Sequence, residues 1–123
     1  MLQNESILMV ADNSGAQKLL IIRCLGGSNR RYSRIGDLVI ATVKKAKPNC
    51  DIKKGQIVLA LIVTTRRYFH RHNNVWVKFS KNYAVLVKKE SKEPIGTRIF
   101  VPLLTEFDEW GYKKVFSLAP EVL

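Results

Sequence analysis

Cysteines, acidic residues and long apolar runs are scarce in this 123-residue sequence, and each shortage excludes a class of protein. The two cysteines, Cys24 and Cys50, form no CxxC pair, so neither a disulfide scaffold nor a four-ligand zinc site is expected. No apolar run approaches the roughly 18–20 residues of a membrane-spanning helix, which argues against a membrane-embedded protein. Residues 1–10 contain no Lys or Arg and resemble neither a signal nor a transit peptide. We therefore expect a soluble protein of a reducing compartment.

Sequence patterns that mark enzymes are missing as well. The chain contains no GxSxG, no GxxxxGK followed by Ser or Thr, and no GxGxxG. His70 and His72 stand one residue apart, but no neighbouring carboxylate and no cysteine at ligand spacing accompanies them. We expect no catalytic residue, no metal and no cofactor. A nuclease that uses the two histidines is the enzymatic alternative, and it predicts that His70→Ala abolishes RNA cleavage.

The positive charge is concentrated in the middle of the chain. Overall, 21 Lys and Arg residues stand against 10 Asp and Glu residues, for a net charge of +11. Residues 13–89 hold 17 of these cations and only two acids, which gives +15, whereas residues 1–12 and 90–123 each carry −2. Such a one-sided surface repels itself unless a polyanion neutralises it. Because no basic amphipathic helix is visible, nucleic acid is favoured over an anionic membrane as the partner.

The hydrophobic pattern predicts short strands separated by turns. Runs of aliphatic and β-branched residues, bounded by Gly, Asp and Asn, are typical of strands that close into a small barrel. The last two predicted strands are expected to pair with each other. The predicted strands are 7–10, 19–22 continuing to 25, 38–43, 57–65, 75–79 and 83–87.

The last thirty residues predict helices instead. Pro102 suits a first helical turn and Gly111 a helix end, and a second short helix is predicted at 113–119. Trp110 and Phe116 are predicted to be core residues that pack these helices on the barrel. The predicted fold is mainly β, a single domain over 1–123, with a small closed β-barrel over about 1–90 and a short helical C-terminal region over about 91–123.

Three basic connections, 26–34, 44–54 and 66–74, carry most of the predicted RNA contacts. Arginines bind phosphates bidentately, lysines neutralise the backbone as point charges, and aromatic rings stack on exposed bases. Asn73 and Asn74 tolerate the positive φ of a hairpin tip. The predicted RNA-binding residues are Arg23, Arg30, Arg31, Tyr32, Arg34, Lys44, Lys45, Lys53, Lys54, Arg66, Arg67, Tyr68, His70, Arg71 and Lys78.

Several sequence blocks resemble one family from end to end. ADNSGA at 11–16, LGGS at 25–28, PIGTRIF at 94–100 and SLAPEVL at 117–123 are similar to the universal large-subunit ribosomal protein fourteen family in its bacterial and organellar form. The resemblance implies a five-stranded barrel in the large ribosomal subunit that binds large-subunit rRNA, bridges to small-subunit rRNA and has no catalytic role in translation. It also implies neighbours similar to ribosomal proteins three and nineteen.

The resemblance further implies a docking face for the ribosomal silencing factor at Thr97, Arg98 and Lys114. The chain departs from the family at 73–74, where Asp-Gly is common, and at the aromatic segment 68–72. These departures point to an organellar ribosome, with the mitochondrion first, a plastid second and the bacterial cytoplasm third. The alternative of a different class is a free barrel-type single-strand RNA binder or RNA chaperone, which leaves the blocks 94–100 and 117–123 unexplained.

Overall fold

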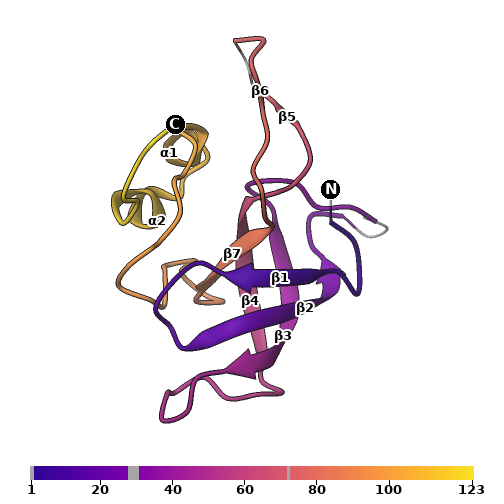
Figure 1. The fold of residues 1–123 in the computed structure, drawn as a ribbon, viewed down its shortest axis with the longest axis vertical. Helices are drawn as coiled ribbons and strands as arrows, with labels where there is room; N and C mark the ends of the chain where they lie inside the picture. The colour runs from indigo at the N-terminus through magenta and orange to yellow at the C-terminus, as the bar shows by residue number, and fades with distance from the viewer. Residues whose placement is uncertain (1, 28–30, 72) are drawn as a thin grey trace.

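Five strands form a closed β-barrel in the computed structural model, which describes residues 2–27, 31–71 and 73–123 (Figure 1). The barrel order is β1-β2-β3-β4-β7, in which β1 and β7 are parallel and every other pair is antiparallel. The predicted five-stranded barrel is therefore confirmed. The elements are β1 (Ile7–Val10), β2 (Ala16–Cys24), β3 (Leu38–Ala46), β4 (Ile57–Thr64), β5 (Phe69–His70), β6 (Trp76–Val77), β7 (Tyr83–Val87), α1 (Glu106–Glu109) and α2 (Lys113–Ser117).

β4 is buried on both faces, which explains why its sequence is a continuous apolar run. Successive strand residues point to opposite faces, so every second side chain enters the barrel. The inward side chains of β4 and β7, among them Ile62 and Leu86, join Leu8, Leu19 and Val43 in an inner core. The burial of both strand faces requires a second layer outside the barrel.

The C-terminal region supplies that layer. The outward side chains of the same two strands, Leu61 and Val85 among them, pack against Leu103, Phe107 and Val115 in an outer core. Phe107 is fully buried there, so this ring anchors the helices on the barrel. The prediction that helices pack against the barrel is confirmed. Across 2–27, 31–71 and 73–123, no helix is long and apolar enough to cross a membrane.

The helices are shorter than predicted. Residues 102–105 are not helical, because Leu103 donates its N–H to the carbonyl of Glu121 and accepts the N–H of Leu123, so this segment bridges to the chain end. The first helix therefore spans only α1 instead of 102–111, and the second ends at Ser117. The prediction of Trp110 as a core residue is wrong, since this residue is 38% exposed. Its ring lies at the edge of the outer core, in edge contact with the buried Phe107.

The predicted pairing of 75–79 with 83–87 is also wrong. Both edges of β7 are already occupied, by β4 on one side and by β1 on the other. β6 pairs instead with β5, Phe69 opposite Val77 and His70 opposite Trp76, and the two form a separate hairpin. Figure 1 shows this hairpin rising from one end of the barrel, with the C-terminal helices beside it and the β3–β4 connection at the opposite end.

Candidate nucleic-acid interface

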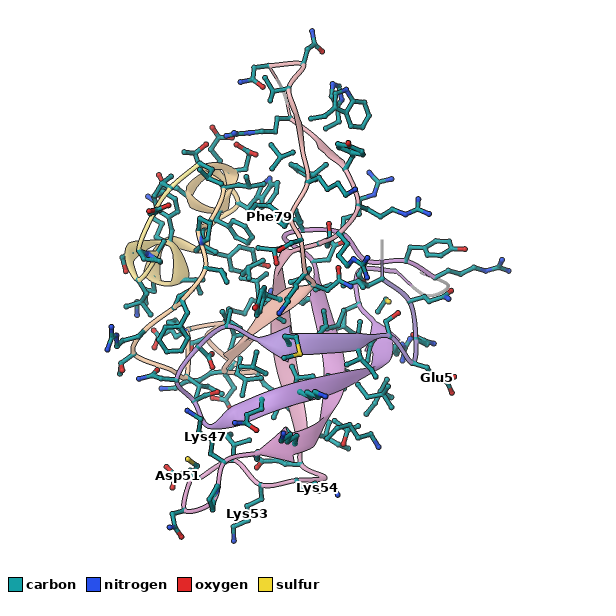
Figure 2. All side chains as sticks on the ribbon, viewed as in Figure 1. Glu5, Lys47, Asp51, Lys53, Lys54 and Phe79 are labelled. Carbon is teal, nitrogen blue, oxygen red and sulfur yellow. The ribbon has the colours of Figure 1, made fainter. Side chains whose placement is uncertain are left out.

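The lysine-rich connection between β3 and β4 forms one basic end of the barrel. Lys44 and Lys45 are exposed at the end of β3, and Lys53 and Lys54 are exposed in the turn that follows. Figure 2 shows Lys53 and Lys54 at the end of the molecule opposite the hairpin. The turn is fixed by backbone bonds, since Gly55 donates its N–H to the carbonyl of Val43 at 2.7 Å. Four exposed ammonium groups on a short, fixed connection can neutralise several phosphates of one RNA backbone.

The β5–β6 hairpin and the connection that precedes β3 form the second basic end. Arg34, from that connection, lines a groove of about 330 Å³ together with Arg67 and the hairpin side chains Tyr68, His70 and Trp76. The structure thus brings together two of the connections that the sequence predicts separately. Ile35, Thr65 and Phe69 complete the lining, so within the described chain no acidic side chain faces this groove. Its two guanidinium-bearing residues are both exposed.

The hairpin has one apolar face and one exposed aromatic face. Phe69 and Val77 form one cross-strand pair and pack against the outer core, with the Phe69 ring 6.0 Å from that of Trp110 in edge contact. The alternate pair, His70 and Trp76, therefore points away from the outer core. Their rings are stacked, with centroids 4.5 Å apart and an interplanar angle of 27°. The alternation of side chains along the hairpin strands thus gives one face that packs on the outer core and an opposite face that is accessible to a ligand.

Tyr68 and Lys78 extend the exposed face toward the barrel. The Tyr68 ring meets Trp76 edge-on at 6.5 Å, and the ammonium of Lys78 lies 5.3 Å from the centre of the Tyr68 ring. Tyr68 is 65% exposed and Trp76 is 61% exposed. Large exposed rings beside exposed cations are the arrangement that single-stranded nucleic acid uses for stacking and phosphate binding.

A comparison with protein families assigns this arrangement to a known class. A family model described as ribosomal protein L14p/L23e matches residues 1–123, the whole chain. The chain belongs to the ribosomal protein L14p/L23e family. As an L14p/L23e protein it is a structural component of the large ribosomal subunit, binds rRNA and other ribosomal proteins, and acts in translation without catalysing a reaction.

The predicted RNA-binding residues of this L14p/L23e chain lie mostly at the two basic ends. Arg30 lies outside the described residues, and the side chain of Arg71 takes part in an intramolecular ion pair. The remaining predicted cations and aromatic rings are exposed. The exposed set comprises Arg23, Arg31, Tyr32, Arg34, Lys44, Lys45, Lys53, Lys54, Arg66, Arg67, Tyr68, His70 and Lys78.

Arg71 joins the hairpin to the C-terminal region. Its guanidinium donates to both carboxylate oxygens of Glu106, at 2.7 to 3.2 Å, to the hydroxyl of Thr105 at 2.9 Å and to the backbone oxygen of Leu123 at 3.0 Å. Burial alone would raise the pKa of Glu106. The hydrogen bonds from Arg71 and Thr105 and the charge of Arg71 outweigh it and hold that pKa below its ordinary value of 4.5. Arg71 therefore positions the hairpin.

The three residues predicted for the silencing factor lie in the C-terminal third, and all are exposed. Thr97 and Arg98 both donate backbone N–H groups to the amide oxygen of Asn13, at 2.8 and 3.1 Å, which ties their turn to the loop after β1. Lys114 forms an ion pair with Glu93, and the hydrogen bond from Lys114 holds the pKa of that carboxyl below its ordinary value. The Thr97 hydroxyl also accepts a hydrogen bond from the Asn13 amide, and all three residues remain exposed at the surface.

Trp76 and Glu106 are the residues that sequence reasoning missed. The strand pattern predicts Trp76 within a barrel strand, although an aromatic residue two positions after Asn74 is a usable signal for the exposed face of a hairpin. Asn74 indeed has a positive φ of 62°, and Asn73 accepts the N–H of Val75 through its side chain. The hairpin tip predicted at Asn73 and Asn74 is therefore confirmed. No local pattern marks Glu106, because its partner is 35 positions away.

Proposed function

We propose that this L14p/L23e chain binds large-subunit rRNA through both basic ends of its barrel and helps to form a bridge to small-subunit rRNA. The whole-chain family match carries the proposal, and the charge distribution supports it. Residues 13–89 hold a net charge of +15, and the ion pairs among the described residues engage only Arg71 and Lys114. The other cations of the two ends that lie in 2–27, 31–71 and 73–123 form no ion pair with a described acid, so they can bind phosphate groups.

The two ends differ in the contacts they offer. The β3–β4 connection presents lysines, which act as hydrated point charges along a backbone, whereas the hairpin end presents arginines, whose planar forks fit phosphate oxygens. Each phosphate that is neutralised releases counterions, so binding is steep in salt. A rigid barrel between the ends holds two RNA segments at a fixed separation, which is a structural role and needs no chemistry.

The C-terminal third supports protein contacts in the proposal. This part carries a net charge of −2 and exposes apolar side chains such as Ile95 and Phe100. We assign to it the contacts with neighbours that resemble ribosomal proteins three and nineteen. The ribosomal silencing factor would dock on Thr97, Arg98 and Lys114 of the same region.

The proposed compartment is the mitochondrial ribosome, with the plastid and then the bacterial cytoplasm as alternatives. The support is the aromatic segment 68–72 and the Asn73-Asn74 tip, where the chain departs from the pattern of the resembling family. Cell fractionation of a tagged chain tests this assignment. Recovery with mitochondrial ribosomes supports it, and recovery only with plastid or cytoplasmic ribosomes contradicts it.

Co-sedimentation with ribosomal particles tests the central proposal. The wild-type chain is expected to run with the large subunit at moderate salt. Replacement of Lys44, Lys45, Lys53 and Lys54 by Gln should release it at lower salt, since each lost phosphate contact weakens binding and reduces the salt slope by about 0.7–0.9.

A matched control changes four exposed lysines away from the two basic ends to Gln, and its sedimentation should stay close to that of the wild type. The control positions are Lys88, Lys89, Lys92 and Lys113. A wild-type chain found free in solution, or equal release of both quadruple variants, contradicts the proposal.

A further inference from the structure

The exposed face of the β5–β6 hairpin combines a pre-assembled aromatic stack with positive charge. His70 and Trp76 are already stacked, with ring centroids 4.5 Å apart, and the Tyr68 ring lies nearly perpendicular to the Trp76 ring. An aromatic platform that is ordered before binding saves the entropy of fixing its side chains when a ligand arrives. Trp76 nevertheless stays 61% exposed, so much of the indole surface remains accessible to another ring.

Two guanidinium-bearing residues share the groove with the aromatic rings. Arg34 and Arg67 line the same groove of about 330 Å³ as the stacked rings, although they come from different connections. Lys78 adds a third cation above Tyr68. A groove lined by both aromatic rings and guanidinium groups is complementary to a base and its phosphate.

We propose that this face holds one unpaired nucleobase of the bound RNA, which extends the Trp76–His70 stack while Arg34 and Arg67 bind its adjacent phosphates. The inference rests on the proposed rRNA-binding function and assigns a specific subsite to it. Bases in a duplex already stack on each other, so a bulged or looped-out base fits the site and a paired base does not.

The charge of the groove favours RNA over a protein partner. An apolar protein surface would bury Trp76 and Tyr68, but it would also desolvate Arg34 and Arg67, for which the described lining offers no carboxylate. RNA satisfies the rings and the cations together. The apolar face of the hairpin, with Phe69, is already covered by the outer core.

Binding of the full chain to two RNA duplexes, one fully paired and one with a single bulged adenosine, tests the subsite. The wild type is expected to prefer the bulged duplex. Trp76→Ala should weaken binding to the bulged duplex by between about 5-fold and about 150-fold, the usual range for one stacked base, and should leave binding to the paired duplex unchanged. Trp76→Phe should retain most of the preference because it keeps a ring.

Val75→Ala is the matched control, since Val75 is a neighbouring exposed apolar residue that does not line the groove. It should bind both duplexes as the wild type does. In a Trp110→Phe background Trp76 is the remaining tryptophan, and its fluorescence should be quenched by the bulged duplex only.

Three outcomes would overturn the subsite. Trp76→Ala could bind the bulged duplex as tightly as the wild type, or it could lose both duplexes equally, which indicates a structural effect. It could also bind both RNAs normally and yet be lost from salt-washed ribosomal particles, which indicates a protein partner. In each case a wild-type chain that sediments with the large subunit keeps the broader function intact, whereas a wild-type chain that binds neither duplex and stays free contradicts both.

Discussion

Removal of the Arg71 side chain gives the sharpest test of how the hairpin is held. The guanidinium makes contacts with Glu106, Thr105 and Leu123, all in the C-terminal region, although Arg71 itself belongs to the hairpin. The two ionic side chains are 16% and 7% exposed, so the pair is largely shielded from water. Arg71→Met keeps much of the aliphatic volume and removes the charge and every hydrogen bond of the guanidinium.

The expected cost follows from this burial. Loss of one partner from a fully buried pair costs about 3–5 kcal/mol, and loss from an exposed pair costs about 0–1 kcal/mol. The Arg71–Glu106 pair lies nearer the first case but at the protein edge, where water can reach the carboxylate left behind. We expect a loss of about 2–3 kcal/mol in the free energy of unfolding. For a chain of this length that corresponds to a fall in Tm of roughly 6–15 °C.

A double-mutant cycle isolates the pair itself. Thermal and denaturant unfolding of Arg71→Met, Glu106→Gln and the double variant should give a coupling energy above about 1 kcal/mol. Lys81→Met serves as the control, because it removes an exposed cation just beyond the hairpin and should change stability by less than about 0.5 kcal/mol. A coupling energy below about 0.5 kcal/mol, or an equal loss in the control, would refute the reasoning.

Three further predictions concern the pH dependence of the Glu106 pair, the outer core and the turn at Gly36. Because the folded pKa of Glu106 is lowered, its charged form stabilises the protein above pH 4.5 and this stability is lost as the pH falls through that pKa, so denaturant titrations should show the wild-type advantage over Glu106→Gln shrinking in acid and not in base. Phe107→Ala empties a fully buried site and should cost about 3–5 kcal/mol by the same measurement, and a loss below about 1 kcal/mol would contradict its anchoring role. Gly36→Ala should cost about 1–3 kcal/mol, since Gly36 has a φ of +91° and an added Cβ would lie 2.5 Å from the Trp110 ring. In a Trp110→Ala background, the part of the stability loss that comes from the clash with the Trp110 ring should disappear. The part that comes from the positive φ at position 36 should remain.

The barrel could be predicted because its signals are local. Apolar runs bounded by turn residues place β1, β2, β3, β4 and β7 within a few residues of their observed ends. Beyond its first residue, β4 is buried along its length because a core lies against each of its faces. Its sequence is accordingly an apolar run with no alternation of polar and apolar residues. Local pattern also gave the hairpin tip, since Asn74 adopts the positive φ that an Asn tolerates.

The errors share one cause, which is competition between distant segments. A run such as 75–79 has strand propensity, but the available edge of the sheet is set by β1 and β4, far away in the sequence. Leu103 lies at helical spacing with Phe107, yet its backbone bonds to the chain end instead. In the sequence, nothing distinguishes Arg71 from the exposed arginines, because only the fold places Glu106 beside it. Local secondary-structure propensity therefore cannot identify pairing partners that lie far apart in the sequence and meet only in the closed fold.

The near-neutral C-terminal region gives the basic hairpin its direction. If the hairpin projected freely, its aromatic face would sample many orientations, and each RNA contact would bear the entropy of fixing it. Phe69 seats one face in the outer core, and Arg71 fixes the tip side to Glu106, so two unlike contacts hold the hairpin at separate points. The acid that binds Arg71 is also kept from opposing the RNA phosphates, because the ion pair neutralises it. The Arg71–Glu106 ion pair therefore both fixes the hairpin and neutralises the acid. Its loss should weaken RNA binding by more than the removal of one positive charge alone would.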